Sequence, residues 1–243
     1  MRRLELSLPS GRATLERVRT GWAIDLLAPS DAAAATELLR AALTRVAEEG
    51  GGLARHWVRA GDPATTAAST ALGLEAEREL LQLRRPLPVD ETTDLVTRSF
   101  VPGQDEAAWL AVNNRAFDWH PEQGGWTLDD VLAREAEPWF DPRGFLLHEV
   151  DGALQGFCWT KEHRDGDPPL GEVYVIAIDP SAAGTGLGAQ LVVAGLAHLH
   201  RQGLAWGMLY VDGANDAGIA LYERLGFTVH HVDTAFTIEV ASA

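Results

Sequence analysis

The sequence predicts an α/β fold with a mixed sheet, built from two copies of one pattern of strands and helices. From residue 143 onward, strand-like and helix-like segments alternate, and a glycine-rich turn separates the third strand from the first helix. A similar order begins at residue 3 with a hairpin, a strand and a long helix. This alternation is typical of sheets that are covered by helices.

The second copy is the more complete of the two. A strand and two helices are expected at residues 94–136. The elements expected after them are strands at 143–150, 153–161 and 171–179, a helix at 186–202, a strand at 206–212, a helix at 215–225 and final strands at 226–231 and 233–240. Asp151-Gly152 favours a hairpin turn, and Pro180 ends the strand before it because proline cannot donate to a ladder.

The first copy is predicted to be truncated and degenerate. It has a hairpin and lacks a counterpart of 94–136, and its further elements are a strand at 23–28, a helix at 31–48 and a strand at 56–58. We therefore expect a degenerate partial domain at residues 1–87, a linker at 88–93 and a complete catalytic domain at 94–243. The alternative is two unrelated α/β segments whose strands and helices are separated by similar turn-forming residues.

Composition restricts the partners and the compartment. The 243 residues carry a net charge of −15 and no run rich in Lys or Arg, which argues against binding to nucleic acid or to an anionic membrane. We see no apolar run of membrane-spanning length and no signal peptide. The single cysteine, Cys158, fits a reducing compartment, and we expect a cytoplasmic monomer. The histidine spacing indicates no metal site.

The turn before the second long helix is the strongest functional signal. Gly184, Gly186 and Gly188 leave the backbone bare where the first N–H groups of the helix lack internal partners. These groups and the positive end of the helix dipole form an anion site. The first copy has Ala32-Ala33-Ala34-Ala35 at the equivalent place, which favours helix instead. The sequence therefore predicts a phosphate-bearing ligand in the second copy only.

The motifs of the second copy resemble a known family. The runs DPSAAGTGLGAQL and YVDGANDAGIALYERLGF, at residues 179–191 and 210–227, resemble the acetyl-CoA-dependent N-acyltransferases of the GNAT superfamily. More narrowly, NNRAFDWHPEQGGWT, GFCWTK and LGEVYVIAIDP resemble the mycothiol synthases, tandem GNAT enzymes that acetylate the cysteinyl amine of a glucosaminyl-inositol conjugate. The resemblance implies a tandem GNAT-like fold, acetyl-CoA as co-substrate and a small-molecule amine as acceptor.

The resemblance also implies roles for particular residues. Glu172 matches the general base, which also contacts the substrate, and Tyr222 matches the tyrosine that protonates the leaving thiolate. Further substrate contacts are implied for Glu122, Lys161 and Tyr210. The coenzyme-binding residues implied are Ile176, Ala177, Ile178, Ala183, Gly184, Thr185, Gly186, Leu187, Gly188, Ala189, Asn215, Asp216, Ala217, Gly218, Ile219 and Ala220.

This chain departs from the family pattern in two places. The usual Gln or Arg that opens the glycine motif is Ala183 here, so phosphate binding would depend on backbone N–H groups and the affinity for the coenzyme should be weaker. The family's first domain is a full copy that contributes a substrate contact, whereas the opening third of that domain is missing here. Two alternatives therefore stay open: another acceptor, such as an amino sugar or a peptide N-terminus, and a coenzyme-binding regulatory module without turnover.

Overall fold

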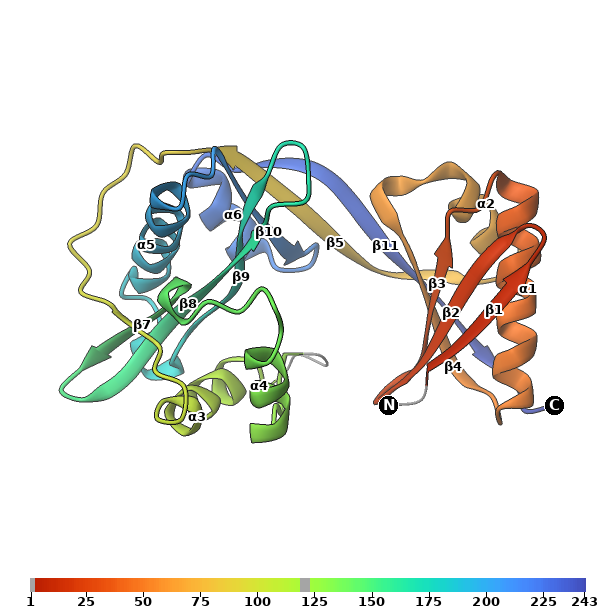
Figure 1. The fold of residues 1–243 in the computed structure, drawn as a ribbon, viewed down its shortest axis with the longest axis horizontal. Coiled ribbons are helices and arrows are strands. Elements are labelled where there is room, and N and C mark those ends of the chain that lie inside the picture. Colours follow the sequence, from red (N-terminus) through yellow and green to blue (C-terminus); the bar gives the residue numbers. More distant parts are fainter. Residues whose placement is uncertain (1–2, 119–122) are drawn as a thin grey trace. The chain divides into compact units, whose positions relative to one another are not determined.

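The computed structural model of the chain describes residues 3–118 and 123–243, and it confirms the predicted mixed α/β fold (Figure 1). It contains two compact units. Unit 1 comprises Met1–Gln82, Val211–Asp216 and Val229–Ala243, and unit 2 comprises Leu83–Tyr210 and Ala217–Thr228. None of the helices in the described part of the chain is long and apolar enough to cross a membrane.

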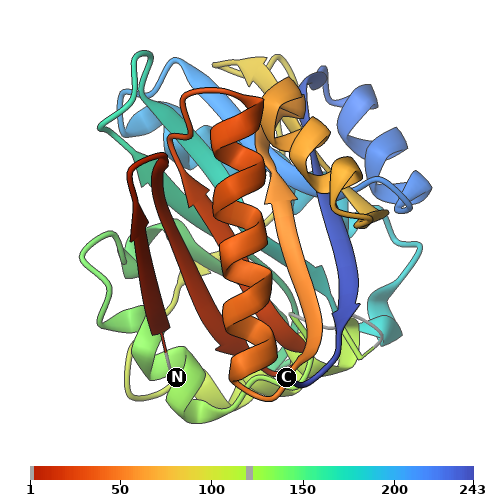
Figure 2. The ribbon, with the colours of Figure 1, turned by 90° about the vertical axis from the view of Figure 1, so that its right-hand side faces the viewer.

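Unit 1 is a sheet covered by two helices. Its elements are β1 (Arg3–Leu8), β2 (Gly11–Val18), β3 (Gly21–Leu27), α1 (Ala32–Glu48), β4 (Gly52–Val58), a 3₁₀ turn at Arg59–Gly61 and α2 (Pro63–Ala71). The strand order is β1-β2-β3-β4-β11, where β11 is Thr228–Val240. Strands β3 and β4 are parallel, and the other pairs are antiparallel. Figure 2 shows α1 lying across strands that include β2 and β3.

Helix α1 forms because its sequence combines an N-capping residue with a stripe of apolar residues on one face. Asp31 is the N-cap, and its side chain accepts a hydrogen bond from the backbone N–H of Ala34. Leu38, Leu39, Ala42 and Val46 recur at helical spacing and are fully buried. They pack with β-strand side chains such as Trp22 and Ile24 to form the core of this unit.

Unit 2 also contains sheet strands, with helices on both of their faces. Its elements are β6 (Arg98–Ser99), α3 (Glu106–Ala116), α4 (Leu128–Glu135), a 3₁₀ turn at Pro142–Gly144, β7 (Phe145–Val150), β8 (Ala153–His163), β9 (Leu170–Ile178), a 3₁₀ turn at Pro180–Ala182, α5 (Leu187–Arg201), β10 (Trp206–Asp212) and α6 (Asp216–Arg224). The strand order is β10-β9-β8-β7-β6. Strands β9 and β10 are parallel, and the pairs from β9 to β6 are antiparallel.

Alternation along β8 assigns the two faces of this sheet. Cys158 faces α5, where Gly195 lets the helix approach closely: a Cβ at that glycine would lie 2.5 Å from the Cys158 sulfur. The next residue, Trp159, points to the other face. There it joins an aromatic cluster with Phe145, which it stacks against, and Trp109 of α3.

Strand β9 carries one extra residue in its pairing with β8. Trp159 is opposite Val175, whereas Thr160 is opposite Val173, so Tyr174 forms a bulge. On its other edge, β9 pairs with β10 only at Gly171 and Glu172. The described pairing of β9 beyond Glu172 is therefore with β8 alone, and one backbone edge of its second half is left for another partner.

Two expectations about the end of the chain need correction. The two final strands predicted at 226–231 and 233–240 are one continuous strand, β11, because Asp233, a residue type that favours turns, instead bonds to Arg59 and to the backbone N–H of Ala60. The sequence analysis assigned this segment to the second domain, but Thr234–Val240 pairs antiparallel with Gly52–Val58 of unit 1. Strand β5 (Glu75–Pro86), which we did not predict, likewise contributes residues to both units.

Candidate active site

The start of α5 has the features of an anion-binding site. Gly184 and Gly186 have φ values of 77° and 80°, a region that favours glycine, and a Cβ at either would meet no atom within 4 Å. Gly186 is the N-cap and provides no side-chain cap. In the described structure, no protein group accepts a hydrogen bond from the N–H groups of Gly184 to Ala189. A row of N–H donors at a helix N-terminus is suited to a phosphate.

The equivalent helix of unit 1 is closed to such a ligand. The carboxylate of Asp31 accepts from Ala34 N–H at 2.8 Å and so occupies the place that an external anion would take. Its negative charge also opposes a phosphate. The sequence comparison found only the missing glycines, and the structure adds the carboxylate that fills the position.

The predicted coenzyme residues of unit 2 converge on one region. A Cβ at Gly188 in α5 would lie 3.0 Å from the Ile178 side chain in β9 and 3.7 Å from Leu221 in α6. Ile178 lies on the half of β9 that has an unpaired edge, as do Ile176 and Ala177. An extended ligand arm could therefore add to the edge of β9 while its phosphates reach the start of α5.

An ion pair fixes the junction between β9 and this turn. Asp179 accepts hydrogen bonds from the Ser181 hydroxyl at 2.6 Å and its N–H at 2.9 Å. The guanidinium of Arg115, at the end of α3, also donates to it. The Ser181 and Arg115 contacts lower the pKa of Asp179 to about 2. The carboxylate therefore stays charged at neutral pH and holds the end of α3 against the start of the turn.

Glu172 is a buried carboxylate on β9. The residue is 7% exposed and lies at the last position where β9 pairs with β10. One oxygen, Oε2, accepts a hydrogen bond from His163 Nε2 at 2.7 Å. No described residue hydrogen-bonds to the other oxygen. His163 was missed by the sequence analysis, although its i, i+2 spacing from Lys161 on a strand is the signal that places both on one face.

Lys161 lies opposite Glu172 in the register but points to two aromatic rings. Its ammonium is 4.4 Å from the ring centroid of Trp139 and 5.4 Å from that of Tyr174. Cation–π attraction holds the charge between the rings. The structure therefore brings Lys161 and Glu172 to one face of the sheet, with an aromatic wall beside them.

Tyr222 is a buried phenol on α6. It is 9% exposed, its ring packs edge-on against Phe227, and no described residue hydrogen-bonds to its hydroxyl. Burial, with a smaller effect of Cys158, raises the pKa of Tyr222 to about 12. The hydroxyl therefore remains protonated at neutral pH, as a proton donor to a thiolate requires. Cys158 is fully buried, and burial raises its pKa to about 12 as well, so it is no nucleophile.

For the remaining predicted residues, the structure shows fewer contacts that bear on a role in the site. Tyr210 lies on β10 and is 38% exposed. Asn215 and Asp216 belong to unit 1 and Ala217–Ala220 to unit 2. Glu122 lies outside the described residues. Among the described residues, no group of three His, Cys, Asp or Glu side chains could hold a metal ion.

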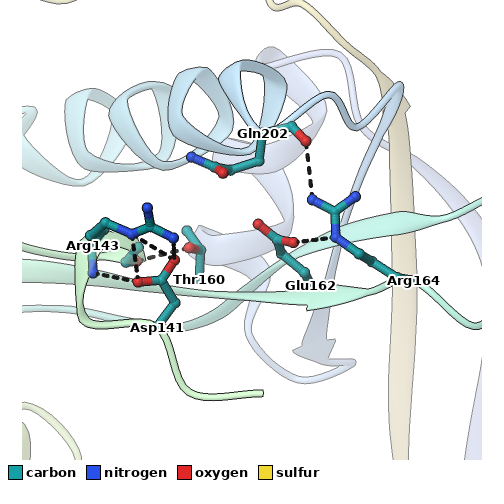
Figure 3. A network of polar contacts seen from close by, with 7 residues as sticks. Asp141, Arg143, Thr160, Glu162, Arg164 and Gln202 are labelled. Carbon is teal, nitrogen blue, oxygen red and sulfur yellow. Dashed lines mark hydrogen bonds and ion pairs between the residues drawn. The ribbon is translucent and has the colours of Figure 1, made fainter. Parts of the chain in front are cut away.

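A polar cavity of about 760 Å³ lies on the other face of β8, where Thr160, Glu162 and Arg164 alternate with Lys161 and His163 (Figure 3). Its charged groups bond to one another. Arg143 pairs with Asp141 at 2.9 Å, and Arg164 donates to Glu162 at 2.7 Å and to the Gln202 carbonyl at 3.0 Å. The Thr160 hydroxyl donates to the Gly144 carbonyl at 2.8 Å and so joins β8 to the 138–144 segment, while Arg164 joins the end of β8 to the end of α5. None of the predicted site residues lines the cavity.

The comparison with protein families covers the segment that carries this site. Residues 109–227 match the Acetyltransferase (GNAT) family, a segment that includes β9, the glycine turn and Tyr222. Curated relatives named mycothiol acetyltransferase are similar over most of the chain. The chain therefore belongs to the GNAT family, and it is an acetyl-CoA-dependent N-acetyltransferase.

The similar proteins extend over both units. The mycothiol acetyltransferase of Thermomonospora curvata is 53% identical over 81% of this chain and 67% of its own length. That of Thermobispora bispora is 50% identical over 80% of this chain and 68% of its own. The chain thus spans about two thirds of the length of these relatives.

Solved structures show the same fold at lower sequence identity. A GCN5-related N-acetyltransferase from Sphaerobacter thermophilus has a TM-score of 0.74 and 20% identity, covering 96% of this chain and 78% of its own. A tandem GNAT protein from the clavulanic acid pathway has a TM-score of 0.72 and 18% identity, covering 96% and 80%.

Proposed function

We propose that this protein transfers the acetyl group of acetyl-CoA to the cysteinyl amine of cysteinyl-glucosaminyl-inositol, the last step of mycothiol synthesis. The observation that carries the proposal is the buried Glu172 carboxylate, with one oxygen held by His163, at the point where β9 leaves β10. The names of the curated relatives support the choice of acceptor.

The reaction requires two proton transfers. The neutral amine attacks the thioester carbonyl carbon, the C–S bond breaks, and an amide and a thiolate form. Glu172 takes the proton that the nitrogen loses, and Tyr222 gives its hydroxyl proton to the thiolate sulfur. An α-amino group has a pKa of about 7.7–8.0, so a carboxylate supplies enough assistance near neutral pH. Backbone N–H groups of the free β9 edge are suited to stabilise the developing oxyanion.

The binding roles are those that the family resemblance implies. The edge at Ile176–Ile178 would hold the acetyl and pantetheine arm, Ala183–Ala189 the pyrophosphate, and Asn215–Ala220 the rest of the coenzyme. Lys161 would contact a hydroxyl-rich part of the acceptor beside the ring of Trp139, and the family resemblance supports Glu122 and Tyr210 as further substrate contacts. We propose that residues 1–87 bind no coenzyme and that the chemistry belongs to the segment from residue 94 onward.

A panel of acceptors tests this function. The protein is incubated with acetyl-CoA and with cysteinyl-glucosaminyl-inositol, glucosaminyl-inositol, glucosamine or a short peptide, and released thiol is followed. Because both cysteinyl-glucosaminyl-inositol and coenzyme A carry thiols, the acetylated product is also measured by mass. We expect the highest kcat/KM with the cysteinyl conjugate. A higher kcat/KM with an amino sugar or with the peptide would show that the proposed acceptor is wrong. Binding of acetyl-CoA without acetylation of any amine would favour a regulatory module.

A further inference from the structure

His163 lies at the right place to control the orientation of the Glu172 carboxylate. The two residues come from neighbouring strands: His163 is the last residue of β8, and Glu172 is the third of β9. His163 Nε2 and Glu172 Oε2 are 2.7 Å apart. An ionised carboxylate has only acceptors, so the imidazole must carry hydrogen on Nε2 and donate it.

The hydrogen bond fixes a side chain that is otherwise free to rotate. A glutamate has three rotatable side-chain bonds, and a base works only when its oxygen faces the proton it receives. His163 fills one of the two oxygens, while the other, Oε1, has no described hydrogen-bond partner. Because the side chain is only 9% exposed, water reaches it poorly, and the histidine is the described group that sets its direction.

The other charged groups on this face leave that bond undisturbed. Lys161, directly opposite Glu172, is held over Trp139 and Tyr174. Tyr174 follows Glu172 by two residues, and the field of the Glu172 carboxylate contributes to raising its pKa, after burial. Arg134 and Glu137 act on the same phenol with opposite signs. Among these groups, only His163 has a described hydrogen bond to Glu172.

We infer that His163 is a positioning residue: its Nε2–H holds Oε2 of Glu172 so that Oε1 faces the amine of the acceptor. The inference rests on the proposed role of Glu172 as general base. It predicts that the effect of His163 passes through that carboxylate and disappears when the carboxylate is removed.

The experiment compares two amides that differ in reach. In His163→Gln the amide nitrogen can take the position of Nε2, whereas in His163→Asn it is too short to do so. We expect His163→Asn and His163→Ala to lower kcat by about tenfold or more, equivalent to ~1.4 kcal/mol of transition-state free energy. His163→Gln should keep most of the activity, and the KM for acetyl-CoA should stay unchanged in all three. His200→Ala, an exposed histidine on α5, is the matched control.

A double-mutant cycle gives the decisive readout. In the Glu172→Gln background, His163→Asn should cause no further loss of kcat, because the group through which it acts is gone. Equal losses in both backgrounds, or equal activity of the Gln and Asn variants, would overturn the inference. These outcomes require a wild-type protein that turns over. A wild type that acetylates no amine would instead refute the proposed function, so the two failures are distinguishable.

Discussion

Lys161 and Glu172 are register partners on β8 and β9, yet within the described structure they form no ion pair with each other. The lysine lies between two aromatic rings, and the glutamate accepts from His163. A direct pair would occupy the carboxylate and block it as a base. In the proposed mechanism, separate partners leave the lysine for binding the acceptor and the glutamate for taking its proton.

Replacing Glu172 by Gln should remove the proton acceptor while preserving the shape of the site. We expect kcat to fall by about 10²–10⁴-fold, the usual contribution of a general base, with acetyl-CoA binding unchanged in calorimetry. Glu162→Gln is the matched control, because Glu162 lies on β8 but faces the polar cavity on the other side of the sheet. If the Glu172 variant keeps kcat within about twofold, the residue is not the base.

Replacing Tyr222 by Phe should slow turnover without destabilising the protein. The ring contact with Phe227 is retained, and the hydroxyl has no described hydrogen bond to lose, so the melting temperature should not change. With a pKa raised to about 12, wild-type Tyr222 stays protonated as the pH rises to about 10. The pH profile of kcat should therefore show no alkaline loss below that pH from this group. A loss near pH 9 that is absent from the Phe variant would contradict the raised pKa, whereas an unchanged kcat in the Phe variant would contradict the role.

Gly186→Ala should weaken acetyl-CoA binding. The added Cβ is strained at a φ of 80°, at a cost of about 1–2 kcal/mol, and it would lie beside the N–H groups that face the phosphates. Gly203→Ala is a matched control: Gly203 has a φ of 84° just after α5, and a Cβ there also meets nothing within 4 Å. Both variants should lose similar stability in denaturant titrations. If Gly186→Ala and Gly203→Ala change the Kd for acetyl-CoA equally, the turn at Gly186 is not part of the binding site.

One acetyl-CoA should bind per chain. Asp31 caps the start of α1 in unit 1, whereas the start of α5 has no such carboxylate. Isothermal titration calorimetry should give a stoichiometry of one. Asp31→Ala should lower stability by about 1 kcal/mol through loss of the cap, without adding a second site. A stoichiometry of two would show that the first unit binds coenzyme despite its carboxylate.

Stability should decrease as the medium becomes mildly acidic. His56 in unit 1 is 2% exposed, and burial lowers its pKa from the ordinary value of 6.5. The unfolded chain therefore binds more protons than the folded chain as the pH falls through 6.5, so the free energy of unfolding falls with it. Urea titrations between pH 7.5 and 5.5 should show this decrease. His56→Asn should be less stable at pH 7.5 but less sensitive to pH, and an unchanged pH dependence would exclude this histidine as the source.

The sequence allowed prediction of elements whose signals are local. The helix predicted at 186–202 is α5 (Leu187–Arg201), and the strand at 171–179 is β9 (Leu170–Ile178), because glycine and proline mark their limits. Asp233 shows where local reasoning fails. It lies in β11, is 1% exposed, and bonds to Arg59 and to the backbone N–H of Ala60. From the neighbouring sequence alone, a buried aspartate that is hydrogen-bonded by a distant loop cannot be distinguished from an aspartate in a turn.

The candidate site divides in the same way. Glu172, Lys161 and Tyr222 could be named because they stand within recognisable runs of sequence. The separation of β9 from β10 and the approach of Trp139 to Lys161 depend on tertiary packing, so no pattern of one segment could predict them. His163 is an intermediate case. Its position on the same face of the strand as Lys161 could be predicted from the sequence, but its hydrogen bond to Glu172 could not.

The pairing of β11 with β4 also has a consequence for synthesis of the chain. Thr234–Val240 completes the ladder of Gly52–Val58, and all of unit 2 lies between these two segments in the sequence. During synthesis, the amino-terminal strands of the first unit leave the ribosome before β11 has been made. The apolar strands of this unit therefore stay without their last pairing partner until residues 234–240 have been synthesised. A nascent chain that stalls inside unit 2 would thus expose an incomplete first unit to chaperones and proteases, so the two units should become protease-resistant in the reverse of their order in the sequence.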